Sequence, residues 1–446
     1  MNKNNSKDYM TRAKLSEYLH AHEDKAVKLA LETLPWDQAR SERVEEKATA
    51  MVNALRKKGP PMGQLEAFMK DYSLETEEGL ALMCLAEALL RVPDKKTANA
   101  LIRDKVEAAN WLDAAGGSKD WGVKAAGVGL FISSKTLDGV LSRLGEPFIR
   151  EAMIQAMQVL GKQFVLGTDI EDAVKHASKY RKKGYRMSYD ILGEAARTAD
   201  DAQRYFDSYL HAINYIGTKE KKDQPRPPGI SVKLSALHPR YEYAQKTRCV
   251  PAIRERLLQL ALAAQKHDLA FTIDAEEADL LELSLDVIES VLPHLDPEWN
   301  GFGCVVQAYQ KRALPLIDHL AGLSQEHHRR LQVRLVKGAY WDSEIKLAHE
   351  EGIEAFPVFT RKTNTDVSYL ACAHKLLDYD AEFYPMFATH NAHSLSAVLE
   401  MAQGRDFECQ RLFGMGSTLF DSVMKEYDMP ASIYAPVGPH RELLPY

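Results

Sequence analysis

Charged side chains alternate with apolar ones in two short segments of the chain. Residues 229–235 read GISVKLS and place Lys233 on the face opposite to the apolar residues, and residues 270–276, AFTIDAE, do the same for Asp274. Successive side chains of a strand point to opposite faces, so the apolar sets would pack under helices and leave Lys233 and Asp274 on the inner face. Burying an unpaired charge costs several kcal/mol, so both must pair with each other or with a ligand.

The next two predicted strands each carry a polar residue among valines and leucines, Gln307 in one and Arg334 in the other. Four adjacent strands thus place a polar or charged side chain inside. One interpretation is a structural network of a Lys–Asp and a Gln–Arg pair. We favour a functional site, because these residues lie toward the carboxyl ends of their strands, where barrel enzymes bind their substrates.

Three other segments predict a binding site for a phosphorylated ligand. In Lys337-Gly338-Ala339-Tyr340-Trp341, the small residues would let backbone approach a flat ligand closely. Thr389-His390-Asn391 leads into a predicted helix that Asn391 would cap, and helix N-termini attract phosphate. Residues 360–363, which include Thr360 and Arg361, add positive charge before another helix. Together they suggest a dinucleotide pyrophosphate site, although a Thr-His-Asn cap alone also has a purely structural explanation.

The elements that must position these residues alternate regularly from about residue 186. Helical stretches are predicted at 196–216, 251–266, 278–292 and 366–378, and eight strands lie between and around them. The predicted strands are 186–192, 229–235, 270–276, 303–309, 332–340, 384–391, 410–416 and 432–438. This alternation is typical of a (β/α)₈ barrel. A doubly wound open sheet is the alternative, weakened because no GxGxxG opens a helix after any strand.

The first 162 residues have a different, all-helical pattern. Apolar residues recur at helical spacing in 25–33, 48–56, 78–91 and 98–112, and no convincing strand lies among them. We therefore predict three parts: a helical arm over 1–45, a small helical domain over 46–162, and the barrel over 163–446.

Composition excludes several classes of protein. A net charge of −6 without a basic block argues against a nucleic-acid partner, and residues 80–90 are too short an apolar stretch to cross a bilayer. The polar N-terminus shows no secretory signal. Five scattered cysteines without a CxxC argue against a zinc site or disulfide framework, and we expect Cys304 and Cys372 to be buried thiols in a cytoplasmic protein. No metal-ligand set or GxSxG nucleophile motif is present.

Eight strings, in this order, resemble the proline dehydrogenase domain of the bifunctional proline utilization A flavoenzymes. They are SVKLSALHPRYE, TIDAEEAD, VVQAYQKRA, VRLVKGAYWDSEIK, TRKTNTDVSYLACA, ATHNAHS, QRLFGMG and YAPVG. The likeness covers nearly all of 163–446, and the preceding helical region also resembles that family's arm and helical domain. The resemblance implies FAD as the cofactor and oxidation of L-proline to Δ¹-pyrroline-5-carboxylate, with hydride transfer to flavin N5.

The resemblance also implies roles for individual residues. Lys233 would bind the proline carboxylate beside Asp274, while Leu412 and Tyr434 would wall the proline ring, with Tyr340 close by. Arg334 would lie near flavin N5. The cofactor-binding set would comprise Ala275, Gln307, Arg334, Val336, Lys337, Gly338, Ala339, Tyr340, Trp341, Thr360, Arg361, Thr389, His390 and Asn391.

Further expectations concern partners and the end of the chain. The family's last barrel helix carries a paired arginine that clamps the substrate carboxylate, and we expect the chain to stop just short of it, which would impair activity. A fused or missing aldehyde dehydrogenase domain, a membrane quinone as electron acceptor, and peripheral contact with the inner face of the membrane are also expected. Two alternatives stay open: a flavin barrel resembling methylenetetrahydrofolate reductases, and a non-catalytic flavin-binding fragment.

Overall fold

The computed structural model describes residues 10–58, 97, 164–220 and 226–439 of the chain. Two compact units divide the sequence: residues 1–53 with 169–437, and residues 54–168 with 438–446. The helices predicted at 78–91 and 98–112 lie outside the described residues.

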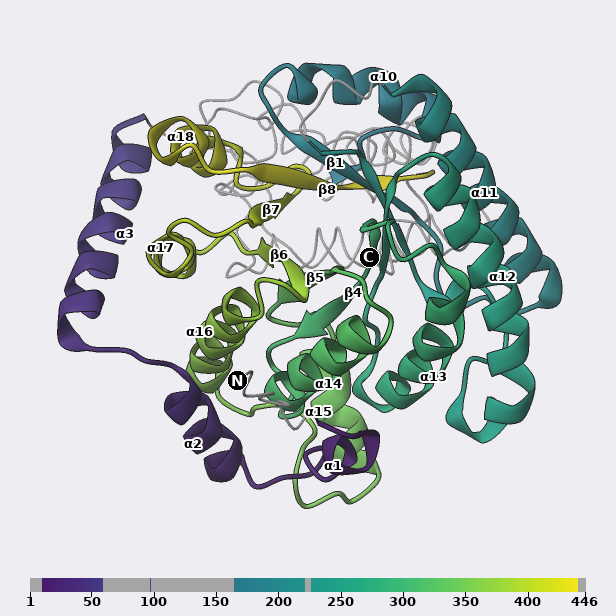
Figure 1. Ribbon diagram of the computed structural model, residues 1–446, viewed down its shortest axis with the longest axis horizontal. Coiled ribbons are helices and arrows are strands. Elements are labelled where there is room, and N and C mark those ends of the chain that lie inside the picture. Colours follow the sequence, from purple (N-terminus) through teal and green to yellow (C-terminus); the bar gives the residue numbers. More distant parts are fainter. Residues whose placement is uncertain (1–9, 59–96, 98–163, 221–225, 440–446) are drawn as a thin grey trace, which may run out of the picture. The chain divides into compact units, whose positions relative to one another are not determined.

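Eight parallel strands close into a barrel in which each strand pairs with its neighbours in sequence and β8 pairs with β1 (Figure 1). The strands are β1 (Arg186–Ile191), β2 (Gly229–Val232), β3 (Ala270–Ile273), β4 (Phe302–Gln307), β5 (Leu331–Val336), β6 (Phe383–Ala388), β7 (Glu408–Leu412) and β8 (Ala431–Val437). The (β/α)₈ barrel that the alternation predicted is therefore confirmed, and the alternative prediction of a doubly wound open sheet is wrong.

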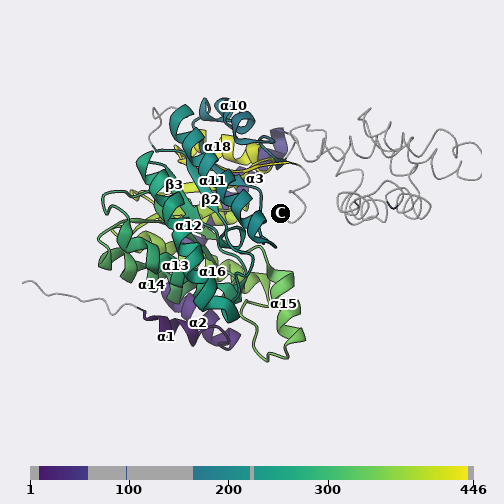
Figure 2. The same cartoon turned by 90° about the vertical axis from the view of Figure 1, so that its right-hand side faces the viewer.

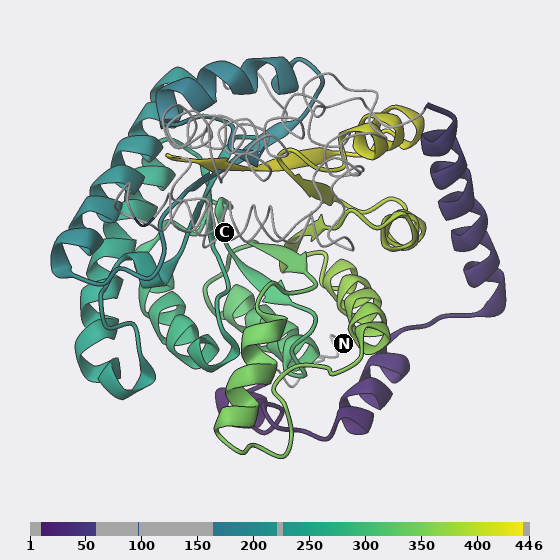
Figure 3. The same cartoon turned by 180° about the vertical axis from the view of Figure 1, so that it is seen from behind.

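A ring of helices surrounds the strands, as the view from behind shows (Figure 3). It consists of α10 (Ile170–Arg181), α11 (Ala199–Lys219), α12 (Lys246–Lys266), α13 (Leu281–Val291), α14 (Ala313–Glu326), α15 (Trp341–Glu350), α16 (Lys362–Asp378), α17 (Ala392–Met401) and α18 (Ser417–Tyr427). Local sequence fixes several starts: Thr198 and Asp201, three residues apart, form a capping box at α11. The helix predicted from Pro251 begins earlier, at Lys246, and the proline lies inside it.

Most strands end earlier than the sequence predicted, and this places the polar residues. β2 stops at Val232, where the chain turns into a short 3₁₀ helix, η1 (Leu234–Ala236). β3 likewise stops at Ile273. Lys233 and Asp274 are therefore the first residues after their strands, at the carboxyl-terminal mouth of the barrel.

Three helices precede the barrel in the described part of the sequence: α1 (Arg12–Ser16), α2 (Glu23–Thr33) and α3 (Gln38–Lys58). Residues 10–53, which we call the arm, run along the outside of the barrel, with α1 against α14 and α2 against α16 (Figure 1). Since α3 runs through residue 45 without a break, the boundary between arm and helical domain stays a prediction.

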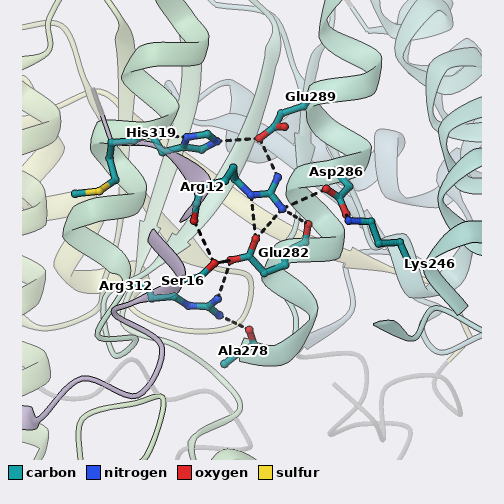
Figure 4. A network of polar contacts seen from close by, with 10 residues as sticks. Arg12, Ser16, Lys246, Ala278, Glu282, Asp286, Glu289, Arg312 and His319 are labelled. Atoms are coloured by element: carbon teal, nitrogen blue, oxygen red, sulfur yellow. Dashed lines mark hydrogen bonds and ion pairs between the residues drawn. The ribbon is translucent and has the colours of Figure 1, made fainter. Parts of the chain in front are cut away.

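An ion network attaches the start of the arm to helix α13 (Figure 4). The guanidinium of Arg12 lies 2.7 Å from Glu282, 3.2 Å from Asp286 and 2.9 Å from Glu289. His319 of α14 joins the same network through Glu289. One arm residue thus bridges to three carboxylates of a barrel helix.

Two features bear on the expected class of protein. Cys304 and Cys372 are buried free thiols, as predicted, and burial raises the pKa of each to about 12. Among the described residues we find no helix that is both long and apolar enough to cross a membrane.

The side view shows α15 set apart from the neighbouring barrel helices (Figure 2), and only Glu344 and Ala348 of its ten residues are buried.

Candidate active site

The ammonium group of Lys233 lies between two carboxylates at the barrel mouth. Its Nζ is 3.2 Å from Asp190 Oδ1 and 3.7 Å from Asp274 Oδ2. Asp190 belongs to β1, so three consecutive strands contribute one charge each. All three side chains are less than one-tenth exposed. The predicted pair of Lys233 and Asp274 is thus brought together, with a third member that the sequence analysis did not single out.

Arg334 of β5, two strands along the barrel from β3, reaches the same aspartate. Its guanidinium donates to Asp274 Oδ1 at 2.7 Å, to Ser231 Oγ at 2.9 Å and to Ser188 Oγ at 3.2 Å. The Tyr434 hydroxyl of β8 donates to Asp274 Oδ2 at 2.7 Å, and the guanidinium lies 4.9 Å from that tyrosine's ring centre. We call Asp190, Lys233, Asp274, Arg334 and Tyr434 the mouth cluster.

Several carboxyl groups in and beside the mouth cluster are hard to ionise. Burial raises the pKa of Asp190, although the Lys233 ammonium opposes this effect. Burial also raises the pKa of Glu194 and raises that of Glu276 to about 7, while Ser235 donates a backbone hydrogen bond to Glu276 at 3.1 Å. The mouth therefore holds carboxyl groups that exchange protons closer to neutral pH than free ones do.

Gln307 lies at the end of β4 but does not pair with Arg334. Its Oε1 accepts a hydrogen bond from Gln310 at 2.6 Å, so the Gln–Arg pair of the structural interpretation is wrong. Gln307, Ala275 and Glu276 instead line a small cavity of about 20 Å³, enough for one water molecule.

Gly338 approaches a protein side chain closely. Its φ is +133°, and a Cβ placed there would lie 2.5 Å from the ring of Tyr309. The glycine was expected to let a ligand come close, but in the structure the need for a glycine here comes from the nearby ring of Tyr309. A side chain at this position would displace that ring or strain the backbone.

The residues around Gly338 are partly or fully exposed. Val336 ends β5, Ala339 is exposed, and Tyr340 occupies the N-cap position of α15. Burial raises the pKa of Tyr340. Trp341 is 41% exposed, and its indole donates to the carbonyl of Phe359 at 2.9 Å. These residues form an accessible wall next to the mouth.

Thr389, His390 and Asn391 follow β6 and each accept a hydrogen bond from the backbone. Asn391 Oδ1 caps α17 by accepting from Ser394 N at 2.9 Å, as predicted. Thr389 Oγ1 accepts from the amide of Asn391, and His390 Nε2 accepts from the amide of Leu412 at 3.0 Å. Burial and the charge of Arg411 lower the pKa of His390, which keeps the ring neutral and able to accept. All three therefore have structural contacts, whatever else they bind.

Leu412 and Tyr434, expected to wall the same substrate, pair in register across β7 and β8. Paired residues of adjacent strands point to the same face, so both side chains face the barrel interior. Tyr434 is buried, whereas Leu412 at the end of its strand is half-buried.

The N-terminus of α16 differs from the expectation. The helix begins at Lys362, so Thr360 and Arg361 directly precede it. The carboxylate of Glu23, from the arm, accepts hydrogen bonds there from the amide and hydroxyl of Thr360 and from the side chain of Asn364. An internal carboxylate thus occupies the place that the sequence assigned to a phosphate.

Cationic groups nonetheless gather between β5 and α16, which fits a dinucleotide cofactor. Lys337 Nζ lies 2.5 Å from Asp366 on α16, and Lys362 lies 3.0 Å from the same carboxylate. The side chain of Arg361, which precedes Lys362 in the sequence, is exposed. Lysines that share one carboxylate are suited to bind an anionic diphosphate, and the buried guanidinium of Arg334 at the mouth suits a group that gains negative charge.

Sequence reasoning missed Asp190 and Glu23. Asp190 could have been found, because the strand RMSYDI alternates in the same way as the two strands that were analysed. Nothing in the sequence near Glu23 indicates its partners, which are more than three hundred residues away.

The fold and the mouth cluster together define a (β/α)₈-barrel protein with a buried ionic site at the carboxyl ends of its strands, the position used by barrel enzymes. A family model described as "Proline dehydrogenase" matches residues 173–446. The chain belongs to the proline dehydrogenase family.

Relatives in curated collections of sequences agree. The chain is 45% identical over 463 residues to the "Bifunctional protein PutA" of Klebsiella aerogenes and 44% identical over 465 residues to that of Escherichia coli K12. Each alignment covers 98% of this chain and 35% of the relative, so the chain spans about a third of their length. "Proline dehydrogenase 2" of Bacillus subtilis is 25% identical and covers 63% of this chain and 82% of its own.

Solved structures lead to the same family. A structure of "proline utilization A (PutA) with proline bound in remote sites" is 44% identical, with a TM-score of 0.72, over 96% of this chain and 44% of the other. A variant of proline utilization A from Bradyrhizobium japonicum is also 44% identical, with a TM-score of 0.71 over the same shares.

A second family model, described as "DNA-binding domain of Proline dehydrogenase", matches residues 64–164. This match conflicts with the expectation that nucleic acid is not a partner. That expectation was based on a charge averaged over the whole chain, and such an average does not exclude DNA binding by a single segment.

Proposed function

We propose that the chain oxidises L-proline to Δ¹-pyrroline-5-carboxylate with FAD as its cofactor. The observation that carries this proposal is the mouth cluster, a buried lysine and arginine around shared aspartates, in a chain of the proline dehydrogenase family. FAD, when bound, accepts the hydride at N5. The chain itself must bind proline, orient it and stabilise the charge that develops.

In this proposal Lys233 binds the substrate carboxylate. Its side chain already has Asp190 and Asp274 as partners, which fix its position in a buried site. Leu412 and Tyr434, which share a face, would border the proline ring, with Tyr340 near them. The hydrogen bond from Tyr434 to Asp274 would hold that aromatic wall in place.

Arg334 would stabilise negative charge on the reduced cofactor. Its guanidinium is held by Asp274, Ser231 and Ser188 and is 3% exposed, so little reorganisation is needed when charge appears. Gln307, Ala275, the segment Val336–Trp341, Thr360, Arg361 and the Thr389–Asn391 segment would supply the remaining cofactor contacts.

We further propose a cytoplasmic protein that passes electrons to a membrane quinone and touches the inner face of the membrane peripherally. The family resemblance supports this part. A quinone analogue that accepts electrons from proline-reduced protein, faster with vesicles than without, would test it.

The cofactor is tested first. Denaturing the purified protein and separating the released flavin should give FAD; FMN alone, or no flavin from folded protein, would contradict the proposal. Anaerobic proline should then bleach the flavin absorbance. Bleaching by a reduced pterin but not by proline would favour the methylenetetrahydrofolate reductase-like alternative, and flavin that no substrate bleaches would favour a non-catalytic fragment.

Lys233→Met tests the substrate site against a matched variant. Charge-assisted hydrogen bonds contribute about 1.5–3 kcal/mol, so proline should bind at least tenfold more weakly. Lys246→Met removes a similar lysine–aspartate contact, with Asp286 at 2.6 Å, on the outer surface and should leave proline affinity unchanged. Equal affinities in the two variants would place the carboxylate elsewhere.

The second family model favours a second candidate function, DNA binding by the segment 64–164. That segment carries slightly more aspartate and glutamate than lysine and arginine, an unusual balance for a phosphate-binding surface. A gel-shift titration of the whole chain with duplex DNA at two salt concentrations decides: a complex that weakens with salt supports DNA binding, and no complex at low salt contradicts it.

A further inference from the structure

One contact between the arm and the barrel is made by the carboxylate of Glu23, the first residue of α2. Its two oxygens accept from the amide of Thr360 at 3.1 Å, from the Thr360 hydroxyl at 2.8 Å and from Asn364 Nδ2 at 2.6 Å. These donors straddle the first residue of α16. Glu23 therefore holds together the turn that leads into this helix.

Glu23 remains ionised in this position. Its partial burial disfavours the charge, but hydrogen bonds from Asn364 and Thr360 outweigh that effect and lower its pKa. The rest of α2 packs on α16 through its small buried residues Ala26 and Ala30. The contact is thus a docked helix with a charged end, rather than an incidental surface bond.

The first turn of α16 connects Glu23 to the barrel mouth. Asp366, two residues after Asn364, lies 2.5 Å from Lys337 and 3.0 Å from Lys362. Partial burial again opposes ionisation, yet the two lysines lower the pKa of Asp366. Lys337 follows the last residue of β5. Glu23 and the Lys337–Asp366 ion pair thus both hold the first turn of α16, which links the arm to the cationic edge of the candidate site.

We propose that Glu23 is a positioning residue that couples docking of the arm to binding of the flavin cofactor. It holds Thr360 and the start of α16 so that Asp366 keeps Lys337 oriented toward the cofactor's anionic diphosphate. This inference rests on the proposed function, since it requires that the cofactor lie along this edge.

Glu23→Gln is a sharp perturbation of this contact. Both carboxylate oxygens accept hydrogen bonds, whereas an amide offers one acceptor and a second group that can only donate. The substitution removes the negative charge, and the Thr360 hydroxyl must then accept rather than donate, so the charge-assisted hydrogen bonds to the 360–364 segment become neutral ones. The matched control is Glu32→Gln on the same helix, because Glu32 pairs with the exposed Lys28 at 3.8 Å and lies away from this turn.

The experiment measures FAD affinity of the flavin-free whole chain by quenching of FAD fluorescence, with thermal unfolding of the same samples. We expect Glu23→Gln to bind FAD roughly tenfold more weakly, within the usual range of coupling between two sites. Glu32→Gln should match the wild type. Arg12→Gln, which loosens α1 at α13 but leaves the Glu23 contact of α2 in place, should lower the melting temperature without a comparable loss of FAD affinity.

Coupling is reciprocal, which gives a readout independent of activity. FAD should slow hydrogen–deuterium exchange of the α2 amides in the wild type and have little effect in Glu23→Gln. If that variant does not fold, Asn364→Ala removes the shortest bond from the other side and should also weaken FAD binding. Tight and equal FAD affinity in wild type and variants overturns the role of Glu23 but not the proposed function. Failure of the wild type to bind FAD overturns both.

Discussion

The barrel contains two buried arginine–carboxylate pairs, one at each end. At the mouth, Arg334 and Asp274 lie 2.7 Å apart; at the opposite end, Arg186 and Glu408 lie 2.5 Å apart, at the first residues of β1 and β7. Both pairs are less than one-tenth exposed. Their chemistry is nearly the same, so a buried ion pair by itself does not identify a functional site.

The two pairs differ in their surroundings. Glu408 also accepts hydrogen bonds from the hydroxyls of Ser432 and Tyr384, which belong to the neighbouring strands. Both of its carboxylate oxygens therefore have partners within the sheet. Asp274 follows its strand and shares its oxygens among Arg334, Lys233 and Tyr434, where the loops of the mouth begin. The Arg186–Glu408 pair borders a cavity of about 780 Å³ at its own end of the barrel but has both carboxylate oxygens bonded within the sheet, whereas Asp274 lies where the loops of the mouth begin. The following variants test this difference.

The largest effect should come from Arg186→Met. It leaves Glu408 buried without its cation, and breaking a buried pair in this way costs about 3–5 kcal/mol of folding free energy. Chemical denaturation should show the loss, while the rate of flavin reduction by proline in the folded fraction stays at the wild-type value. A slowed reduction in well-folded protein would mean that the two ends of the barrel are not functionally separate.

Arg334→Met, unlike Arg186→Met, should slow the reduction of the flavin by proline. Losing one well-placed electrostatic donor costs roughly 2.7–4 kcal/mol of transition-state stabilisation, or 10²–10³ in rate. Stopped-flow reduction should slow by that factor, and the flavin potential should fall. An unchanged rate and potential in a flavin-loaded variant would make Arg334 as structural as Arg186.

Glu276→Gln tests the protonation state at the mouth. With a pKa raised to about 7, the carboxyl stabilises the fold below the unfolded value near 4.5, and this contribution is lost as pH rises through 7. Glutamine cannot ionise and keeps an acceptor for Ser235, so the variant should gain about 3 kcal/mol over the wild type above pH 8 and little at pH 4. Exposed Glu45→Gln on α3 is the control. A gain that does not depend on pH would contradict the assignment.

The smallest effect should come from Tyr434→Phe. It removes one hydrogen bond to Asp274, 2.7 Å long, and keeps the aromatic wall. A bond to a charged group contributes about 1.5–3 kcal/mol, so proline affinity or reduction rate should fall by roughly tenfold. Tyr384→Phe removes the corresponding bond to Glu408 and should change neither quantity. Equal behaviour of the two variants would remove the distinction between the ends.

Much of this architecture could be predicted from local sequence patterns. Local patterns identified all eight strands, and period-two alternation in two of them identified the inward faces that carry Lys233 and Asp274, because side-chain direction along a strand is a local property. Asn391 was recognised as a helix cap for the same reason. Strand ends were less accurate: β2 and β3 stop three residues early, where the loops around the mouth take over.

What the sequence by itself determined is therefore which residues face the barrel interior and where its helices lie. The tertiary structure alone decided the partners. Asp190 and Lys233 are 43 residues apart, Tyr434 and Asp274 are 160 apart, and Glu23 and Thr360 are 337 apart. No local pattern encodes such pairs, because they exist only once the barrel closes and β8 lies beside β1. The same closure gave Gly338 its tyrosine neighbour and placed a carboxylate of the arm where the sequence had predicted a phosphate.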